Sequence, residues 1–429
     1  MFDDRNVSPE NQKKLWEHYY NTLSKGIDVG FNPKLEMNDP ELANSLKYDI
    51  AKFSAFKETS FRKQLEAALT ANGKVAPWSE FKKTADALNV DYNRRWLKTE
   101  YDHTVATANM AQQWKGFVAD ADLYPNLKYV TAGDARVRDE HKILDGTILP
   151  IDHLFWKTHC TPLDWGCRCN IEQTNDKQSE KIPDFKVKKA FQNNPYYSGK
   201  VFNESPYTLG LGKDEFDDAE KFGKDNFESK NNFDILSKNQ DFKNNLKIIK
   251  DNKLDKIYPN IEIEKINSVY TYTSNSYEEI NKFNRTGNFV EDIKKGRTKE
   301  YYQTLTKTIN NTLDEIPDKF QGLTYRGTDL DKATFKKYKD AFESGKPISD
   351  KGFTSTSYDQ KEGFGGTHKF KIVSKNGTIV DKISANGVDA AKLDGINEKE
   401  VLFKAGQEFK VSYILETEPG KYEIFMEQI

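Results

Sequence analysis

The sequence has no long apolar run. None of its 429 residues belongs to an uninterrupted stretch of the roughly 18 apolar residues that a membrane-spanning helix needs. The first residues, Met1–Asn6, are polar and acidic, whereas a secretory signal peptide begins with basic residues and continues with an apolar stretch. We therefore expect a protein with no signal peptide and no membrane partner, made in a cytoplasm and exported, if at all, by another route.

The sequence also has few cysteines and a small net charge. Three cysteines cannot all pair within the chain, so a disulfide framework is excluded, and all three fall in the short segment His159–Cys169. The 65 basic and 67 acidic residues give a formal net charge of -2. A nucleic-acid-binding surface normally shows itself as a basic excess, so we expect no direct nucleic-acid site.

The chain is too long for one ordinary domain, and its texture changes along its length. Residues from about 9 to 114 carry apolar residues at helical spacing, with the clearest helix over Tyr92–Phe117, and short strand-like pieces follow Pro125. From 176 to 240 the chain is polar without a sustained period, which indicates a linker. An alternative is that its phenylalanines are anchors that dock on a partner or on the amino-terminal domain: Phe216, Phe222, Phe227 and Phe233.

Helical patterns open the last part of the chain, and alternating strands close it. Helices are expected over Lys243–Asp255 and Glu300–Leu313, and strands from Leu323 to Tyr422–Met426. The sequence thus predicts an α+β protein of two domains. Residues 1–175 form a helical half that ends in a small β region, residues 176–240 form the linker, and residues 241–429 form helices plus a two-sheet β-sandwich.

Three short motifs follow one another in the last quarter of the chain: Tyr325-Arg326-Gly327, Gly352–Ser357 with its Ser-Thr-Ser run, and Glu398–Phe403. Arginine offers a permanently charged fork that can clamp a pyrophosphate. Serine and threonine hydroxyls can hold a ribose and a neighbouring carboxylate. Two glutamates one residue apart, at the opening of a strand, are expected on the same face because side chains alternate. Together the motifs predict one NAD+ site.

The chemistry that these residues suit is cleavage of the glycosidic bond to nicotinamide. Such a cleavage passes through an oxocarbenium-like cation, which a nearby carboxylate stabilises as its charge develops. We expect Glu400 in this role, hydrogen-bonded to the ribose 2'-hydroxyl. Glu398 is then placed to orient an incoming nucleophile or to accept its proton.

The order of the three motifs, with Val401-Leu402-Phe403 following the glutamates, resembles the bacterial toxin ADP-ribosyltransferases of the Arg-Ser-Glu class. The resemblance implies NAD+ as substrate, with Arg326 on its phosphates, Ser355 supporting the catalytic glutamate and Glu400 as that glutamate. Glu398, where other members have glutamine, implies arginine as acceptor. The family's aromatic upstream helices are similar to Tyr270–Tyr272 and Tyr277–Asn281.

Other contacts to NAD+ are expected around these motifs. The cofactor-binding set that we predict is Arg326, Gly327, Ser355, Thr356 and Phe364. Phe364, in the glycine-rich loop after the triplet, is placed to lie over nicotinamide, or is an ordinary turn residue. The loop Ala385–Asn397 departs from the family because it has no aromatic residue to touch a target protein. The target is therefore left open, and hydrolysis of NAD+ is an alternative to transfer.

A second signature lies in the amino-terminal half. It runs over Thr131–Gly146, continues with Trp156 and closes with Cys167-Arg168-Cys169. Across about residues 80 to 175 it resembles the phage head morphogenesis family, the Mu F-like minor capsid proteins. The resemblance implies a protein built into or packaged within a phage head, with portal and capsid proteins as partners.

The same residues allow a metal hypothesis. Cys160, Cys167 and Cys169, with His141, His153 or His159, supply the thiolates and imidazole of a tetrahedral zinc site. The spacing is not that of a two-knuckle site, since Cys-x-Cys strains both thiolates toward one ion. Buried thiols that pack a small β region are the expectation, and zinc is the alternative.

The two signatures in one chain predict a phage-associated toxin. The capsid-like half places the protein in the virion head for delivery to the host cytoplasm, and the other half transfers ADP-ribose from NAD+ to a host protein, on arginine. The alternatives are a minor head structural protein with an inactive transferase-like domain, and an NAD+ glycohydrolase.

Overall fold

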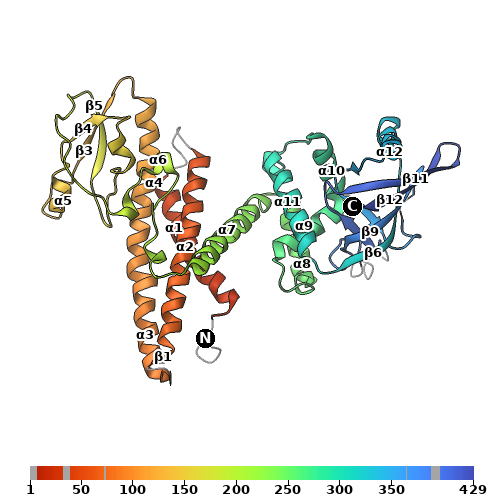
Figure 1. Ribbon diagram of the computed structural model, residues 1–429, viewed down its shortest axis with the longest axis horizontal. Coiled ribbons are helices and arrows are strands. Elements are labelled where there is room, and N and C mark those ends of the chain that lie inside the picture. The colour runs from red at the N-terminus through yellow and green to blue at the C-terminus, as the bar shows by residue number, and fades with distance from the viewer. Residues whose placement is uncertain (1–6, 32–38, 72–73, 364, 388–396) are drawn as a thin grey trace. The chain divides into compact units, whose positions relative to one another are not determined.

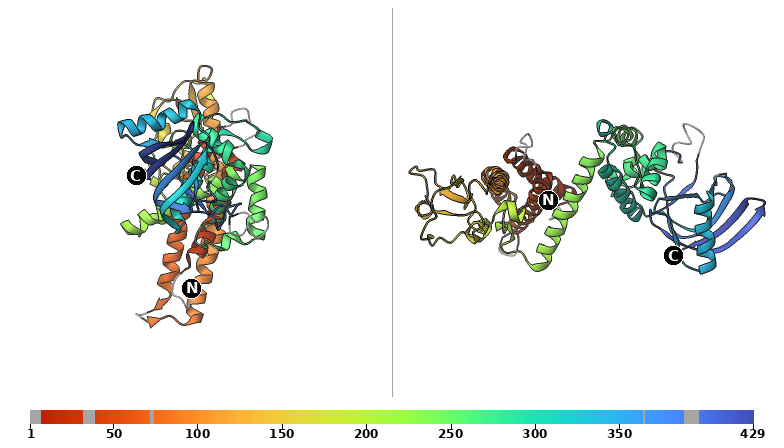
Figure 2. Two further views of the ribbon diagram at one scale, coloured as in Figure 1. Left: turned by 90° about the vertical axis from the view of Figure 1, so that its right-hand side faces the viewer. Right: turned by 90° about the horizontal axis from the view of Figure 1, so that it is seen from above.

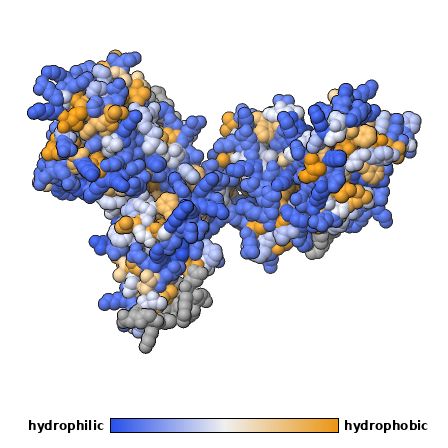
Figure 3. Space-filling view, viewed as in Figure 1, coloured by the Kyte–Doolittle hydropathy of each residue, from blue (hydrophilic) through white to orange (hydrophobic). Residues whose placement is uncertain are grey.

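The computed structural model describes the chain except for residues 1–6, 32–38, 72–73, 364 and 388–396 (Figure 1). The chain forms two compact units, Met1–Ser229 and Lys230–Ile429. None of the described helices is long and apolar enough to cross a membrane. On the face drawn in Figure 3, hydrophobic residues appear in scattered groups on a largely hydrophilic surface.

Long helices build the first unit: α1 (Pro9–Gly30), α2 (Pro40–Ala68), α3 (Trp78–Val90) and α4 (Leu97–Ala119). The π-helical turn η1 (Asp91–Trp96) joins α3 to α4, so the predicted helix over Tyr92–Phe117 is confirmed. Ser8 and Asp39 cap α1 and α2, each just before a proline whose missing N–H is not needed in a first turn. The short strands β1 (Thr70–Ala71) and β2 (Lys74–Val75) follow α2. In this unit α1 packs against both α2 and α4.

The predicted small β region follows α4. Strand β3 (Asn126–Val130) pairs antiparallel with β4 (Ile148–Pro150) on one side and β5 (Asn170–Thr174) on the other. The short helices α5 (Asp139–Lys142) and η2 (Leu154–Lys157) lie in the connections. Trp156 is fully buried here, and its indole N–H donates to the carbonyl of Pro150 at 2.9 Å.

The segment 176–240, predicted to be a linker, is largely folded onto the first unit. It holds η3 (Lys189–Phe191), α6 (Pro195–Ser198), η4 (Pro206–Thr208) and α7 (Lys213–Leu236). The buried Asp49 carboxylate accepts the backbone N–H groups of Val201 and Phe202 at 2.9 and 3.1 Å. Phe222 and Phe227 pack in the first core, while Phe233 packs in the second. The division at residue 229 therefore differs from the predicted boundaries. The burial of these few apolar side chains stabilises a folded segment although most of its residues are polar.

The second unit opens with helices: α8 (Gln240–Asp251), η5 (Leu254–Lys256), α9 (Ile263–Thr271), η6 (Tyr272–Ser276), α10 (Tyr277–Thr286), η7 (Ile293–Lys295) and α11 (Lys299–Glu315). The strands are β6 (Lys319–Thr328), β7 (Ile348–Ser349), β8 (Thr354–Ser357), β9 (His368–Ile379), β10 (Glu400–Phe403), β11 (Glu408–Glu418) and β12 (Lys421–Gln428). Helix α12 (Lys332–Ser344) lies between β6 and β7 in the sequence. Helices followed by strands confirm the α+β class.

Among the described residues these strands form one hydrogen-bonded sheet with the order β10-β8-β6-β9-β12-β11-β7. The predicted two-sheet sandwich differs from this in detail, because β10 also pairs with β9 and the sheet closes on itself. One edge of the long β9 is shared: its first half pairs with β12, and Thr378 and Ile379 pair with β10. Strands β6, β8, β10 and β9 therefore form a closed ring.

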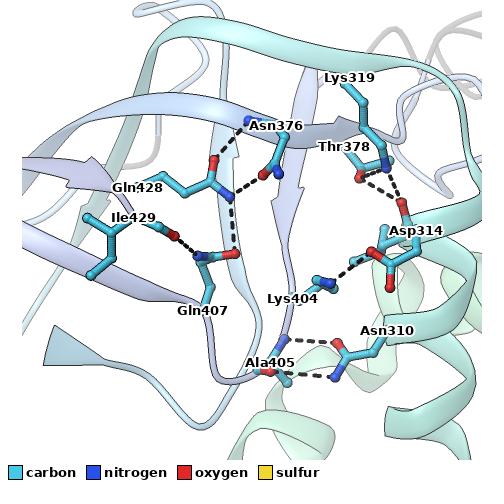
Figure 4. Close-up of polar contacts among 11 residues, drawn as sticks. Asn310, Asp314, Lys319, Asn376, Thr378, Lys404, Ala405, Gln407, Gln428 and Ile429 are labelled. Carbon is cyan, nitrogen blue, oxygen red and sulfur yellow. Dashed lines mark hydrogen bonds and ion pairs between the residues drawn. The ribbon is translucent and has the colours of Figure 1, made fainter. Parts of the chain in front are cut away.

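Helices cover both faces of the sheet (Figure 2). Side chains of α8, α9 and α11 share a core with Phe353, Val380 and Leu402, whereas Phe335 of α12 packs in a different core with Phe370 and Ile424. The turn after β10 is tied to α11 (Figure 4): the amide of Asn310 bonds the backbone N–H and carbonyl of Ala405 at 3.0 and 3.5 Å. Lys404 also lies 2.8 Å from the Asp314 carboxylate. These bonds fix the end of the strand that begins at Glu400.

Candidate active site

Arg326, Ser355 and Glu400 stand on neighbouring strands, β6, β8 and β10. The antiparallel register places Ser355 opposite Leu402 and therefore diagonal to Glu400 on the same face. The Ser355 hydroxyl donates to Glu400 Oε1 at 2.7 Å, and Arg326 Nη1 donates to the Ser355 carbonyl at 2.8 Å. The structure thus brings together the residues that the three motifs single out.

The Glu400 carboxylate is the buried acid of this site. The residue is only 4% exposed, and its other oxygen lies 3.4 Å from the Ser384 hydroxyl, which donates to it. Burial raises the pKa of Glu400 to about 7, an effect that the Ser355 hydrogen bond opposes and the nearby Glu398 charge reinforces. The carboxylate therefore changes its charge near neutral pH.

Glu398 lies before the strand that carries Glu400, whereas side-chain alternation predicts that both glutamates lie on that strand. Strand β10 begins at Glu400, and the intervening Lys399 has a φ of 48°, in the left-handed region. Glu398 is therefore in the turn before the strand, and the same-face argument for the two glutamates is corrected. The Asn386 amide donates to Glu398 Oε1 at 3.2 Å, and burial raises the pKa of this carboxyl.

The remaining predicted cofactor contacts differ in their placement. Thr356 is buried and its hydroxyl donates to the Val401 carbonyl at 2.8 Å, so it does not accompany Ser355 toward Glu400. Gly327 is a buried β6 residue that pairs with Lys369 of β9. Phe364 lies outside the described residues, and so does most of the loop Ala385–Asn397.

Helices η6 and α10 supply a support for the site that the motifs do not specify. Asn281 donates to the Tyr272 hydroxyl at 3.0 Å and accepts the backbone N–H of Phe353 at 2.8 Å. The Tyr272 and Phe353 rings lie 4.9 Å apart. A β-carbon on Gly352 would come within 2.7 Å of Asn281 Oδ1, so this glycine is needed for the contact. Burial and the Glu400 charge raise the pKa of Tyr272, which places its hydroxyl in the surroundings of that carboxylate.

A cavity of about 610 Å³ opens beside Arg326. Arg285, Tyr338, Asp350 and Thr354 also line it, and Arg285 forms a bidentate pair with Asp350 at 2.9 and 2.7 Å. The volume is that of a site for a small-molecule ligand. The guanidinium groups of Arg326 and Arg285 both line this cavity, and such groups suit a diphosphate. Arg285 was not predicted from the sequence as a site residue.

The metal candidates lie in the first unit. Among the described residues, the ligand atoms that converge are those of His141, Cys167 and Cys169. Cys160 is buried but does not belong to this group. His159 stacks on Phe155 with ring centroids 4.1 Å apart, and His153 caps η2, so neither histidine joins the cluster.

Two family profiles match separate parts of the chain. Residues 222–429 match the sequence profile of the ADP-ribosyltransferase exoenzyme family. Residues 50–172 match the profile of Phage Mu protein F like protein. The chain thus carries an ADP-ribosyltransferase exoenzyme domain in its carboxyl-terminal half and a Mu F-like segment in its amino-terminal half, which confirms both resemblances.

Two curated relatives match short stretches of the chain. The chain is 39% identical over 77 residues to "Putative capsid assembly protein F" of Escherichia phage Mu, covering 18% of each chain. It is 34% identical over 82 residues to the Mu-like prophage FluMu F protein of Haemophilus influenzae, covering 19% of this chain and 20% of that protein. The chain therefore matches about a fifth of the length of these curated relatives.

Solved structures of ADP-ribosyltransferases are similar to part of this chain. HopU1 of Pseudomonas syringae aligns over 44% of this chain and 87% of its own, with 18% identity and a TM-score of 0.35. Exoenzyme S of Pseudomonas aeruginosa, bound to carba-NAD, aligns over 39% and 74% with 20% identity and a TM-score of 0.30. The Salmonella SpvB domain aligns over 39% and 100% with 20% identity and a TM-score of 0.33.

Proposed function

We propose that this protein transfers ADP-ribose from NAD+ to an arginine side chain of a host protein and releases nicotinamide. The observation that carries the proposal is the chain of contacts from Arg326 through Ser355 to the buried Glu400 carboxylate, beside a cavity with a second arginine. In the proposed complex the NAD+ diphosphate lies between Arg326 and Arg285. The nicotinamide ribose then lies over Glu400.

In the proposed reaction the bond between ribose C1' and the nicotinamide nitrogen breaks, and its electron pair leaves with neutral nicotinamide. The cation left at C1' is stabilised by the Glu400 carboxylate, which acts in its ionised form. Ser355 holds one carboxylate oxygen through its 2.7 Å hydrogen bond and so fixes the direction of the charge. An arginine guanidine nitrogen of the target forms the new bond to C1'.

Glu398 supports the choice of arginine as acceptor. A guanidinium nucleophile must lose a proton as it attacks, and a carboxylate next to Glu400 can both bind the guanidinium and accept that proton. The raised pKa of Glu398, which follows from its burial, makes it a better base than an exposed glutamate.

The Mu F-like segment supports a proposal for delivery. The relative from Escherichia phage Mu is described as a capsid assembly protein. We infer that residues 50–172 hold this chain in a phage head through portal or capsid proteins, so that the enzyme enters the host cytoplasm with the virion contents.

One experiment tests the enzymatic proposal. The full chain is incubated with NAD+ labelled in its adenylate part and with bacterial lysate, beside the Glu400→Gln and Glu398→Gln variants. Label on protein that is lost in both variants, and that neutral hydroxylamine releases as expected for an arginine linkage, supports arginine transfer. Free nicotinamide with no protein label favours an NAD+ glycohydrolase. If neither label nor nicotinamide appears, the enzyme proposal fails and a structural head protein remains.

A further inference from the structure

Three metal-ligand side chains converge in the small β region, far in sequence from the NAD+ residues. His141 lies on α5, and Cys167 and Cys169 lie just before β5. Their ligand atoms all lie within 4.8 Å of one another, and His141 is only 2% exposed. None of these side chains has a part in the proposed transferase chemistry.

The distances are those of a shared ion. In a tetrahedral zinc site, Zn–S bonds of about 2.3 Å and Zn–N bonds of about 2.0 Å place sulfur and nitrogen roughly 3.6 Å apart. Here His141 Nδ1 lies 3.7 Å from Cys167 Sγ and 3.9 Å from Cys169 Sγ. A ring nitrogen carries at most one proton, so it can donate fully to one sulfur at a time, whereas an ion between the three atoms would bind all of them.

The space at the cluster also suits a single ion. A cavity of about 20 Å³ is bounded by His141, Cys167 and Cys169, and this is room for one ion or one water molecule. Arg168 stands between the two cysteines in sequence, but its guanidinium forms a bidentate pair with Asp134 at 2.8 and 2.6 Å. Its positive charge is therefore compensated. Arg136 and Arg138 also line this cavity: Arg136 lies 3.9 Å from the same Asp134 carboxylate, and Arg138 donates to the Trp165 carbonyl at 2.6 Å.

We propose that His141 Nδ1, Cys167 Sγ and Cys169 Sγ bind one Zn²⁺ ion, with a water molecule in the fourth position. Imidazole and thiolate are the ligands that zinc prefers in proteins. The ion would join α5 to the start of β5, in a region whose strand β4 has only three residues. A metal link between these two elements contributes to the stability of the folded region.

The proposal is tested by metal analysis of the full chain, purified with a reductant present. We expect about one zinc per chain. The content should fall at least about tenfold in His141→Ala, Cys167→Ala and Cys169→Ala. The matched control is Cys160→Ala, because Cys160 is buried in the same unit but lies outside the cluster. This variant should keep its zinc.

Cobalt replacement on the unaltered chain gives an answer that does not depend on variants folding. Co²⁺ exchanged into the site should show thiolate-to-metal charge-transfer bands and the intense visible bands of a tetrahedral ion. Less than roughly half an equivalent of zinc together with no thiolate bands for Co²⁺ would overturn the proposal. So would a mass that shows a Cys167–Cys169 disulfide in the reduced preparation, or zinc that persists in all three cluster variants.

Discussion

The Ser355 hydroxyl donates a 2.7 Å hydrogen bond to Glu400 Oε1, across two paired strands. This bond favours the ionised carboxylate, while burial favours the protonated one. The balance between the two sets the pH at which Glu400 carries its charge. Several properties of the proposed enzyme depend on that balance.

Activity should rise with pH and level off above about 7. Glu400 is proposed to act as a carboxylate, and its pKa of about 7 means that the acidic limb reports its ionisation. Burial also raises the pKa of Glu398, so the ionisation of Glu398 should likewise make the activity increase with pH. The measurement is kcat/KM for nicotinamide release between pH 5 and 9, with both limits chosen to bracket a pKa of about 7. A flat profile across this range would contradict the assignment of Glu400.

Ser355→Ala should move that acidic limb to higher pH. A hydrogen bond to a charged group contributes about 1.5–3 kcal/mol, which corresponds to a shift of roughly one to two pH units. The rate at pH 7 should fall about tenfold or more, and part of it should return at pH 9. Ser357→Ala is the matched control, because the Ser357 hydroxyl faces the Lys399 carbonyl at 3.5 Å and not Glu400. Its profile should resemble that of the unaltered chain.

Glu400→Gln should stabilise the protein at alkaline pH. The folded-state pKa of about 7 lies above the ordinary value of 4.5, so the folded chain binds the proton more tightly than the unfolded chain. The free energy of unfolding therefore falls as the pH rises between these values, by up to about 3 kcal/mol, and is level above them. Tm of the variant minus Tm of the unaltered chain should be larger at pH 8 than at pH 5. Equal differences would show that Glu400 is not buried as an acid.

Arg326→Lys should weaken NAD+ binding. Lysine keeps the positive charge but loses the planar fork, which here also holds the Ser355 carbonyl at 2.8 Å. We expect KM for NAD+ to rise at least about tenfold. Arg297→Lys is the control, since Arg297 pairs with Asp241 and Glu279 and does not line the cavity. An unchanged KM for NAD+ in the Arg326 variant would show that the diphosphate binds elsewhere.

A fragment that starts at residue 230 should be more stable than one that starts at 241. The longer fragment keeps Leu236, which is fully buried in the second core, and Phe233, which packs beside it. Loss of one buried leucine side chain costs about 2–5 kcal/mol. Leu236→Ala in the longer fragment should reproduce much of the loss in Tm, whereas Ile248→Ala should have little effect because Ile248 is 41% exposed.

Local chemistry in the sequence was enough to find the site, because Arg326, Ser355 and Glu400 each lie in a short motif whose order the fold preserves. Period-two alternation failed for Glu398 because Lys399 has a left-handed backbone, so that the strand begins only at Glu400. The sequence could not place Arg285 or Asn281 at the site, since helix α10 reaches it only through tertiary packing. Because its composition is polar, α7 was predicted to be part of a linker. Which of its phenylalanines are buried depends on packing against residues that lie far away in the sequence.

The closed ring of β6, β8, β10 and β9 has a consequence for the cell that makes this protein. Two of the three strands that carry a site residue pair with a strand made later: Arg326 of β6 pairs with Phe370 of β9, and Ser355 of β8 pairs with Leu402 of β10. Strand β10, which carries Glu400, is made after both of its partners, β8 and β9. A ribosome-bound chain that stops before Glu400 contains no assembled site. The proposed toxin would thus be inactive until translation has passed Glu400. Chains that terminate before that residue would be inactive as well.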